Sequence, residues 1–153
     1  MKKILFPCCI FLLSFQTFAQ TTNITKKKFH DGQFNEQDTA IGYTEALLAD
    51  NILYISGAVG KGTIAEQLQK IYTDLGDILK AYGASYQNVV KETLFTTDIE
   101  AVKKNNNVRK AFYKGDFPAA TWVQISGLFS SRSGSQVEVE LIAHLPKAAG
   151  NKK

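Results

Sequence analysis

The chain has 153 residues, of which 44% are hydrophobic and 21% are charged, and its formal net charge at pH 7 is +4. This length fits one domain that buries enough surface to fold alone. The modest charge argues against a nucleic-acid partner, which would call for a strongly basic face.

The first 19 residues have the layout of a secretory signal peptide. Lys2 and Lys3 precede an apolar run over residues 4–15, and Thr17-Phe18-Ala19 provides small residues before Gln20. The run of about a dozen residues is too short to cross a bilayer of about 30 Å as a helix. We therefore expect a periplasmic or secreted protein with no membrane attachment after cleavage; an uncleaved anchor is the alternative.

Removal of residues 1–19 changes the composition of the mature protein. Both cysteines, Cys8 and Cys9, lie in this segment, so the remainder has no disulfide and no thiol chemistry. Two of the 18 basic residues also leave while all 14 acidic residues stay, which lowers the net charge to +2.

Residues 20–39 are polar and predict an N-terminal tail without regular structure. Two apolar runs follow, over residues 43–49 and 52–56, and Asp50-Asn51 between them suits a two-residue hairpin turn. Residues 57–62 predict a loop. The spacing of its glycines does not match that of a phosphate-binding loop, so a plain turn is expected.

An amphipathic helix is predicted after this loop, over residues 64–82, with Thr63 and Glu66 in a capping box and Gly83 after its end. Residues 89–97 predict a strand. A second helix is predicted over residues 99–113, although its three consecutive asparagines weaken it.

Two further strands are predicted over residues 119–126 and 136–145, joined by a Ser/Gly loop, and residues 148–153 form a C-terminal tail. The order is ββαβαββ, which indicates an α+β fold with one mixed sheet and both helices on one face. Because strands rich in apolar residues would leave the other face uncovered, we expect that face to pack against another subunit.

Few residues in the sequence are suited to chemistry. His30 and His144 are the only histidines, and no cluster with ligand spacing surrounds them, so no metal site is predicted. Glu138 and Glu140 share one face of the last predicted strand. They are either a solvated pair or, if that face is an interface, they include a buried carboxylate with a raised pKa that can hold water or move a proton.

Five segments in order resemble the RidA/YjgF family of imine and enamine deaminases: residues 40–43, 52–57, 89–98, 117–119 and 137–143. The resemblance covers residues 40–147. It implies a chorismate-mutase-like fold, a homotrimer and clefts between subunits that bind small carboxylate-bearing molecules. It also implies hydrolysis of reactive imines to keto acids and ammonia without a cofactor.

The resemblance assigns site residues by position. Glu138 matches the catalytic carboxylate that positions the hydrolytic water, and Tyr43, Ser56 and Gly57 match residues that face the ligand. The family's arginine follows a Phe-Pro-Ala sequence, and in this chain the residue after Phe117-Pro118-Ala119 is Ala120.

An arginine fork grips a carboxylate with two parallel hydrogen bonds, whereas alanine offers no donor. Trp122, two residues later, adds bulk to the ligand cleft that the resemblance implies. Arg109 and Arg132 are candidate substitute cations, or solvated surface residues. Three functions follow as expectations: a metabolite-binding trimer with little deaminase activity, an active imine deaminase that uses water held by Glu138, or a structural or partner-binding trimer.

Overall fold

The computed structural model describes residues 24–129 and 134–146. The predicted signal peptide, the C-terminal tail and Arg132 lie outside these residues. The described strands form one sheet in the order β2-β1-β3-β4-β7-β5-β6. β5 and β6 are parallel and all other neighbours are antiparallel, so the predicted mixed sheet is confirmed.

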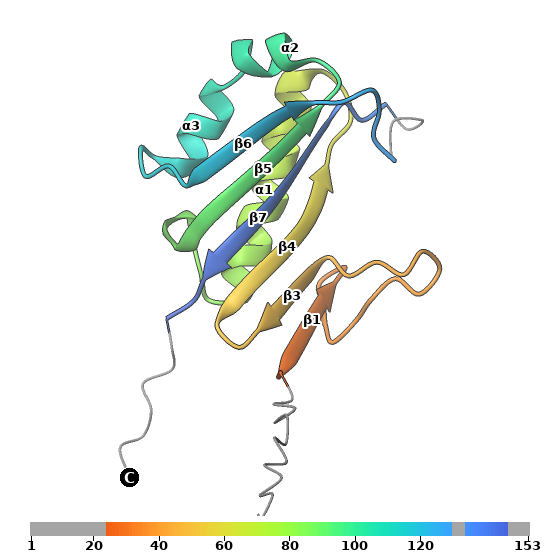
Figure 1. Cartoon of the computed structure of the whole chain (residues 1–153), viewed down its shortest axis with the longest axis vertical. Helices are drawn as coiled ribbons and strands as arrows, with labels where there is room; N and C mark the ends of the chain where they lie inside the picture. Colours follow the sequence, from red (N-terminus) through yellow and green to blue (C-terminus); the bar gives the residue numbers. More distant parts are fainter. Residues whose placement is uncertain (1–23, 130–133, 147–153) are drawn as a thin grey trace, which may run out of the picture.

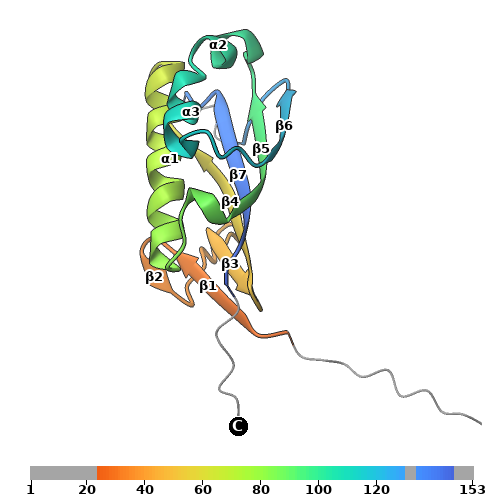
Figure 2. The same cartoon turned by 90° about the vertical axis from the view of Figure 1, so that its left-hand side faces the viewer.

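Three α-helices cover one face of this sheet, as the side view shows (Figures 1 and 2). The helices are α1 (Ile64–Ala81), α2 (Ile99–Lys104) and α3 (Asn107–Tyr113), with a short 3-10 helix, η1 (Tyr86–Asn88), before β5. The strands are β1 (Lys26–His30), β2 (Gln33–Phe34), β3 (Ala46–Ala49), β4 (Ile52–Val59), β5 (Val89–Thr96), β6 (Ala119–Gln124) and β7 (Val137–His144). None of the described helices is both long and apolar enough to cross a membrane.

Local sequence signals located the hairpin and the long helix correctly. β3 and β4 pair as predicted, and Asp50 in their turn has a positive φ of 55°. The capping box of α1 is formed, since Thr63 accepts a hydrogen bond from the Glu66 amide and the Glu66 carboxylate accepts one from the Thr63 amide.

The second predicted helix and the predicted loop over residues 57–62 differ from the structure. The helix predicted over residues 99–113 is divided into α2 and α3 at Asn105 and Asn106. Asn105 turns its side chain back to the Ala101 carbonyl, the local bond that makes asparagine a weak helix former. The loop predicted over residues 57–62 starts later, because β4 continues to Val59.

The polar tail predicted over residues 20–39 is wrong for β1 and β2, which extend the sheet on the β3 side. Phe29 explains why a lysine-rich segment joins the fold. Its side chain is buried, pairs with Ala46 across the strands and packs against the rings of Phe34 and Tyr82. One buried aromatic ring in an otherwise polar segment does not produce the alternating pattern by which a strand is predicted.

The last strand, β7, alternates as predicted. Val137, Val139, Leu141 and Ala143 are buried against the helices, and Glu138 lies on the opposite face. No described helix covers that opposite face. Tyr54 and Val123 remain exposed there at 43% and 37%.

Candidate functional site

A bulge in β4 brings its backbone close to β7. The β4–β7 register shifts between Ile55 and Ala58, so that Ser56 and Gly57 together interrupt the ladder. At Gly57 a β-carbon would lie only 1.8 Å from Oε1 of Glu138. Glycine is therefore required for the Glu138 carboxylate to rest against the backbone of β4.

Tyr43 approaches the same bulge from the segment before β3. Its hydroxyl donates a hydrogen bond to the Gly57 carbonyl at 3.3 Å. Burial, followed by the negative charges of Glu45 and Glu138, raises the pKa of Tyr43 to about 12. The phenol therefore stays protonated at neutral pH and acts as a hydrogen-bond donor.

Glu138 is the free carboxylate of this group. It is half-buried, and burial together with the neighbouring charge of Glu140 raises its pKa above the ordinary value. None of the described residues donates a hydrogen bond to it. With Tyr43 and Gly57 it lines a cavity of about 240 Å³ that Ile41, Val59 and Phe129 complete. A carboxylate in this setting can hold a water molecule and accept its proton.

Ser56 lines a cavity together with Tyr43 and Gly57, and its hydroxyl and amide are both hydrogen-bonded to the backbone. Its hydroxyl donates to the Thr44 carbonyl at 2.7 Å, and its amide donates to the Glu45 carbonyl at 2.9 Å. The side chain therefore anchors the bulge and does not present a free hydroxyl. The predicted ligand contact of Ser56 stays a prediction.

Of the other predicted residues, Ala120 and Trp122 lie on the edge strand β6, and Arg109 lies on helix α3. Ala120 is exposed on the edge strand β6, and β5 and β7 separate that strand from β4. The Trp122 indole donates to the carboxylate of Glu92 at 3.2 Å. Within one chain the structure does not bring this group to Glu138.

Glu92 is a polar centre that the sequence analysis missed. Its side chain is completely buried on the helix face of β5. It accepts hydrogen bonds from Arg109 at 2.7 Å, Tyr113 at 2.8 Å and Tyr72 at 3.1 Å, in addition to the indole. The available signal was a glutamate at an inward position of an otherwise apolar strand.

Arg109 is neither a solvated surface residue nor a free cation. Only 8% of it is exposed, and its charge is paired with Glu92. Its guanidinium lies over the rings of Tyr113, Phe117 and Trp122 at 5.0, 5.2 and 5.5 Å. The pair fixes α3 against β5 and β6.

One set of metal-binding groups converges where the sequence predicted none. His30, Asp31 and Glu45 have ligand atoms within 4.8 Å of one another. They could hold a divalent cation, but they already interact among themselves: the imidazole contacts Asp31 at 3.1 Å, and Glu45 accepts the Asp31 amide at 2.8 Å. These contacts connect the β1–β2 turn to the segment before β3.

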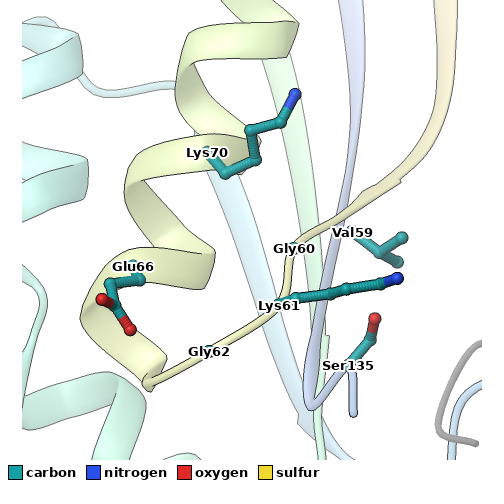
Figure 3. Close-up of a pocket in the computed structure, with 7 residues that line it drawn as sticks. All are labelled: Val59, Gly60, Lys61, Gly62, Glu66, Lys70 and Ser135. Atoms are coloured by element: carbon teal, nitrogen blue, oxygen red, sulfur yellow. The ribbon is translucent and has the colours of Figure 1, made fainter. Parts of the chain in front are cut away.

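Another cavity, of about 630 Å³, lies between the end of β4 and the start of α1 (Figure 3). It contains none of the residues predicted to bind a ligand. It is lined by Val59, Gly60, Lys61, Gly62, Glu66, Lys70 and Ser135. Val59 also borders the cavity of Tyr43 and Glu138, so the two cavities are neighbours.

Comparison with known proteins identifies the family of the chain. The family model described as endoribonuclease L-PSP matches residues 33–145. The human protein named 2-iminobutanoate/2-iminopropanoate deaminase is 36% identical over 114 residues, which cover 68% of this chain and 81% of the human protein. The bovine protein of the same name is 38% identical with the same coverage.

Solved structures give the same result. A RidA from the Antarctic bacterium Psychrobacter sp. PAMC 21119 superposes with a TM-score of 0.64 at 26% identity, covering 71% of this chain and 93% of that one. A YjgF/YER057c/UK114 family member from Mycobacterium tuberculosis has a TM-score of 0.69 at 24% identity, covering 79% and 100%, and supports the fold. The chain therefore belongs to the RidA/YjgF family, of which the endoribonuclease L-PSP model and the deaminases above are part.

Proposed function

We propose that this protein hydrolyses small imines or enamines in the cavity of Tyr43, Gly57 and Glu138. The observation that carries the proposal is the state of Glu138, a half-buried carboxylate with a raised pKa and no hydrogen-bond donor among the described residues. The names of the deaminases to which the chain is similar support the same reaction class.

The reaction needs only water and one base. Glu138 accepts a proton from a water molecule while the water oxygen bonds to the carbon of the C=N group, and the protonated Glu138 then passes that proton to the nitrogen. Collapse of this tetrahedral adduct breaks the C–N bond, releases ammonia and leaves a carbonyl product. Tyr43 stays protonated and keeps the Gly57 turn in place through its hydrogen bond.

The substrate preference follows from the missing cation. In the proposed trimer Ala120 has no donor to offer the cavity of a neighbouring subunit, and the charge of Arg109 is already paired with Glu92. Losing an arginine clamp costs about 2–5 kcal/mol of binding, or roughly 30-fold to several thousand-fold in affinity. We therefore propose that neutral imines are processed better than 2-imino acids.

A second candidate function is metabolite binding with little turnover, and the exposed Ala120 is the observation that favours it. A ligand that binds the native protein raises its melting temperature by mass action. This candidate predicts thermal stabilisation by small imine analogues together with no ammonia release. A purely structural protein would show neither effect.

We also propose a homotrimer whose subunits pack through the sheet face opposite the helices. The exposure of Tyr54 and Val123 on that face supports this. Light scattering on the purified protein should give three times the mass of one chain, and a monomer at micromolar concentration would refute the proposal.

Export to the periplasm or medium is a further proposal that rests on residues 1–19. Mass spectrometry of the protein from its native host should find a mature chain starting at Gln20. A chain that retains Lys2 and Lys3 would refute cleavage.

The central experiment measures ammonia release above the spontaneous rate from a freshly generated neutral imine and from 2-iminobutanoate. Glu138→Gln should lower the enzymatic rate on either substrate by about 10²–10⁴-fold. Glu140→Gln is the matched control, since Glu140 is an exposed carboxylate on the same strand face, and should leave most of the rate. Equal rates for wild type and Glu138→Gln would refute hydrolysis at this site.

A further inference from the structure

The walls of the cavity between β4 and α1 are held in place by close packing and by hydrogen bonds. At Gly60 a β-carbon would lie 2.7 Å from the Cα of Gln67, so this loop is pressed against the first turns of α1. The Gln67 side chain is fully buried and bridges the two sides of the cavity. It donates to the Gly62 carbonyl at 2.8 Å and accepts from the Gln136 amide at 2.8 Å.

Ser135 contributes an unused donor to this cavity. The residue is only 2% exposed, and none of the described residues forms a hydrogen bond with its hydroxyl. Figure 3 shows the hydroxyl pointing toward the side of the cavity occupied by Lys61. A buried hydroxyl without a partner costs free energy, and its presence in a cavity wall is explained if a ligand accepts its hydrogen bond.

Lys61 is exposed and contributes a positive charge that has no ion-pair partner among the described residues. No described carboxylate lies within ion-pair distance of it, as the ion pairs of the described residues show. The other charged groups that line the cavity are already engaged. Lys70 pairs with Asp74 at 2.6 Å, and the Glu66 carboxylate accepts hydrogen bonds from the amide and hydroxyl of Thr63, each at 2.8 Å.

We propose that this cavity binds a small organic carboxylate, with the acid group between the Lys61 ammonium and the Ser135 hydroxyl and the apolar body against Val59. The positive end of the α1 dipole favours an anion at this position. Val59 pairs in register with Glu138 across β4 and β7, so the site adjoins the cavity assigned to hydrolysis. The binding itself requires no reaction and is independent of the proposed hydrolysis.

Butyrate and its neutral isostere butyramide are suitable probes, with binding followed by titration of the backbone amide resonances of the purified protein. Butyrate should bind saturably and shift the amides of Lys61 and Ser135, and butyramide should bind about tenfold more weakly. Lys61→Gln should weaken butyrate binding by about tenfold and leave butyramide binding unchanged. Lys80→Gln, an exposed lysine in the last turn of α1, is the control and should bind like wild type.

Ser135→Ala separates a ligand-binding role from a structural one. Because the variant loses only an unpartnered hydroxyl, its melting temperature without probe should equal or exceed that of wild type, while butyrate binding weakens severalfold. Equal affinity for the two probes, unchanged binding in Lys61→Gln, or shifts confined to Tyr43 and Glu138 would overturn the proposal. Loss of hydrolysis in Glu138→Gln with butyrate binding intact would leave it standing.

Discussion

Glu92 and Glu138 are two carboxylates on opposite faces of the same sheet, and they differ in what surrounds them. Glu92 is completely buried and accepts four hydrogen bonds, one of them from its partner Arg109. Glu138 is half-buried, rests on Gly57 and has no donor among the described residues. A carboxylate whose hydrogen bonds are all satisfied stabilises the fold, whereas one without donors beside a cavity is available for chemistry.

The largest expected effect comes from removing the carboxylate of Glu92. Glu92→Leu leaves Arg109 buried without its partner and should lower the free energy of unfolding by about 3–5 kcal/mol. Urea denaturation measures this loss. Glu100→Leu removes an exposed carboxylate that pairs with Lys103 and should cost less than about 1 kcal/mol. Similar losses in the two variants would show that the buried Glu92 network stabilises the fold no more than an exposed ion pair does.

Glu138 has no hydrogen-bond donor to remove among the described residues, so its contribution to the hydrolysis rate should depend on where its carboxylate lies. Gly57→Ala places a methyl group where Glu138 lies and should reduce imine hydrolysis by about 10²-fold, the effect of an ångström-scale displacement. Stability should change little, because the displaced atoms belong to the flexible end of a side chain. A loss of stability with full activity would show that the contact between Gly57 and Glu138 serves the fold and not the hydrolysis.

Trp122 tests how much one donor contributes to the Glu92 network. Trp122→Phe keeps a ring beside Arg109 but removes the indole hydrogen bond to Glu92, and it should cost about 1 kcal/mol in urea denaturation. Imine hydrolysis should be unaffected if Trp122 acts only within its own chain, because it does not reach Glu138 there. A large loss of activity would place Trp122 in the ligand cavity of a neighbouring subunit.

The smallest effect is a pH dependence of stability. A raised pKa of Glu138 means that the folded state binds its proton more tightly than the unfolded state. Proton binding by Glu138 therefore adds to the free energy of unfolding. This stabilisation is fully present below the pKa of Glu138 in the unfolded state and is lost as the pH rises through its pKa in the folded state. Glu138→Gln should therefore be more stable than wild type at pH 7, with a difference that disappears near pH 3, as thermal melts at the two pH values can show.

The sequence predicted the elements whose signals are local. The turn at Asp50 and the cap at Thr63 each depend on a few neighbouring residues, so the hairpin turn and the start of α1 were predicted, although β3 begins at Ala46 and β4 continues to Val59. β1 could not be predicted, because it is held by one buried ring, Phe29, and by pairing with a strand some 20 residues away.

The candidate site was predicted in part for the same reason. Gly57 and Glu138 were named by resemblance, but their contact depends on a β-bulge that no local pattern reveals. The role of Arg109 was open between a free cation and a solvated residue. Its pairing with Glu92 joins an inward strand position to a helix 17 residues later, a contact that only the folded chain shows.

The pH dependence of imine hydrolysis tests the central claim most directly. If Glu138 is the base, the rate of ammonia release should rise with pH through a single ionisation whose midpoint lies above the ordinary glutamate pKa, since only the ionised form accepts a proton. Glu138→Gln should lose this rise and retain only a low, flat rate. An unchanged profile in Glu138→Gln would contradict the assignment of Glu138 as the catalytic carboxylate.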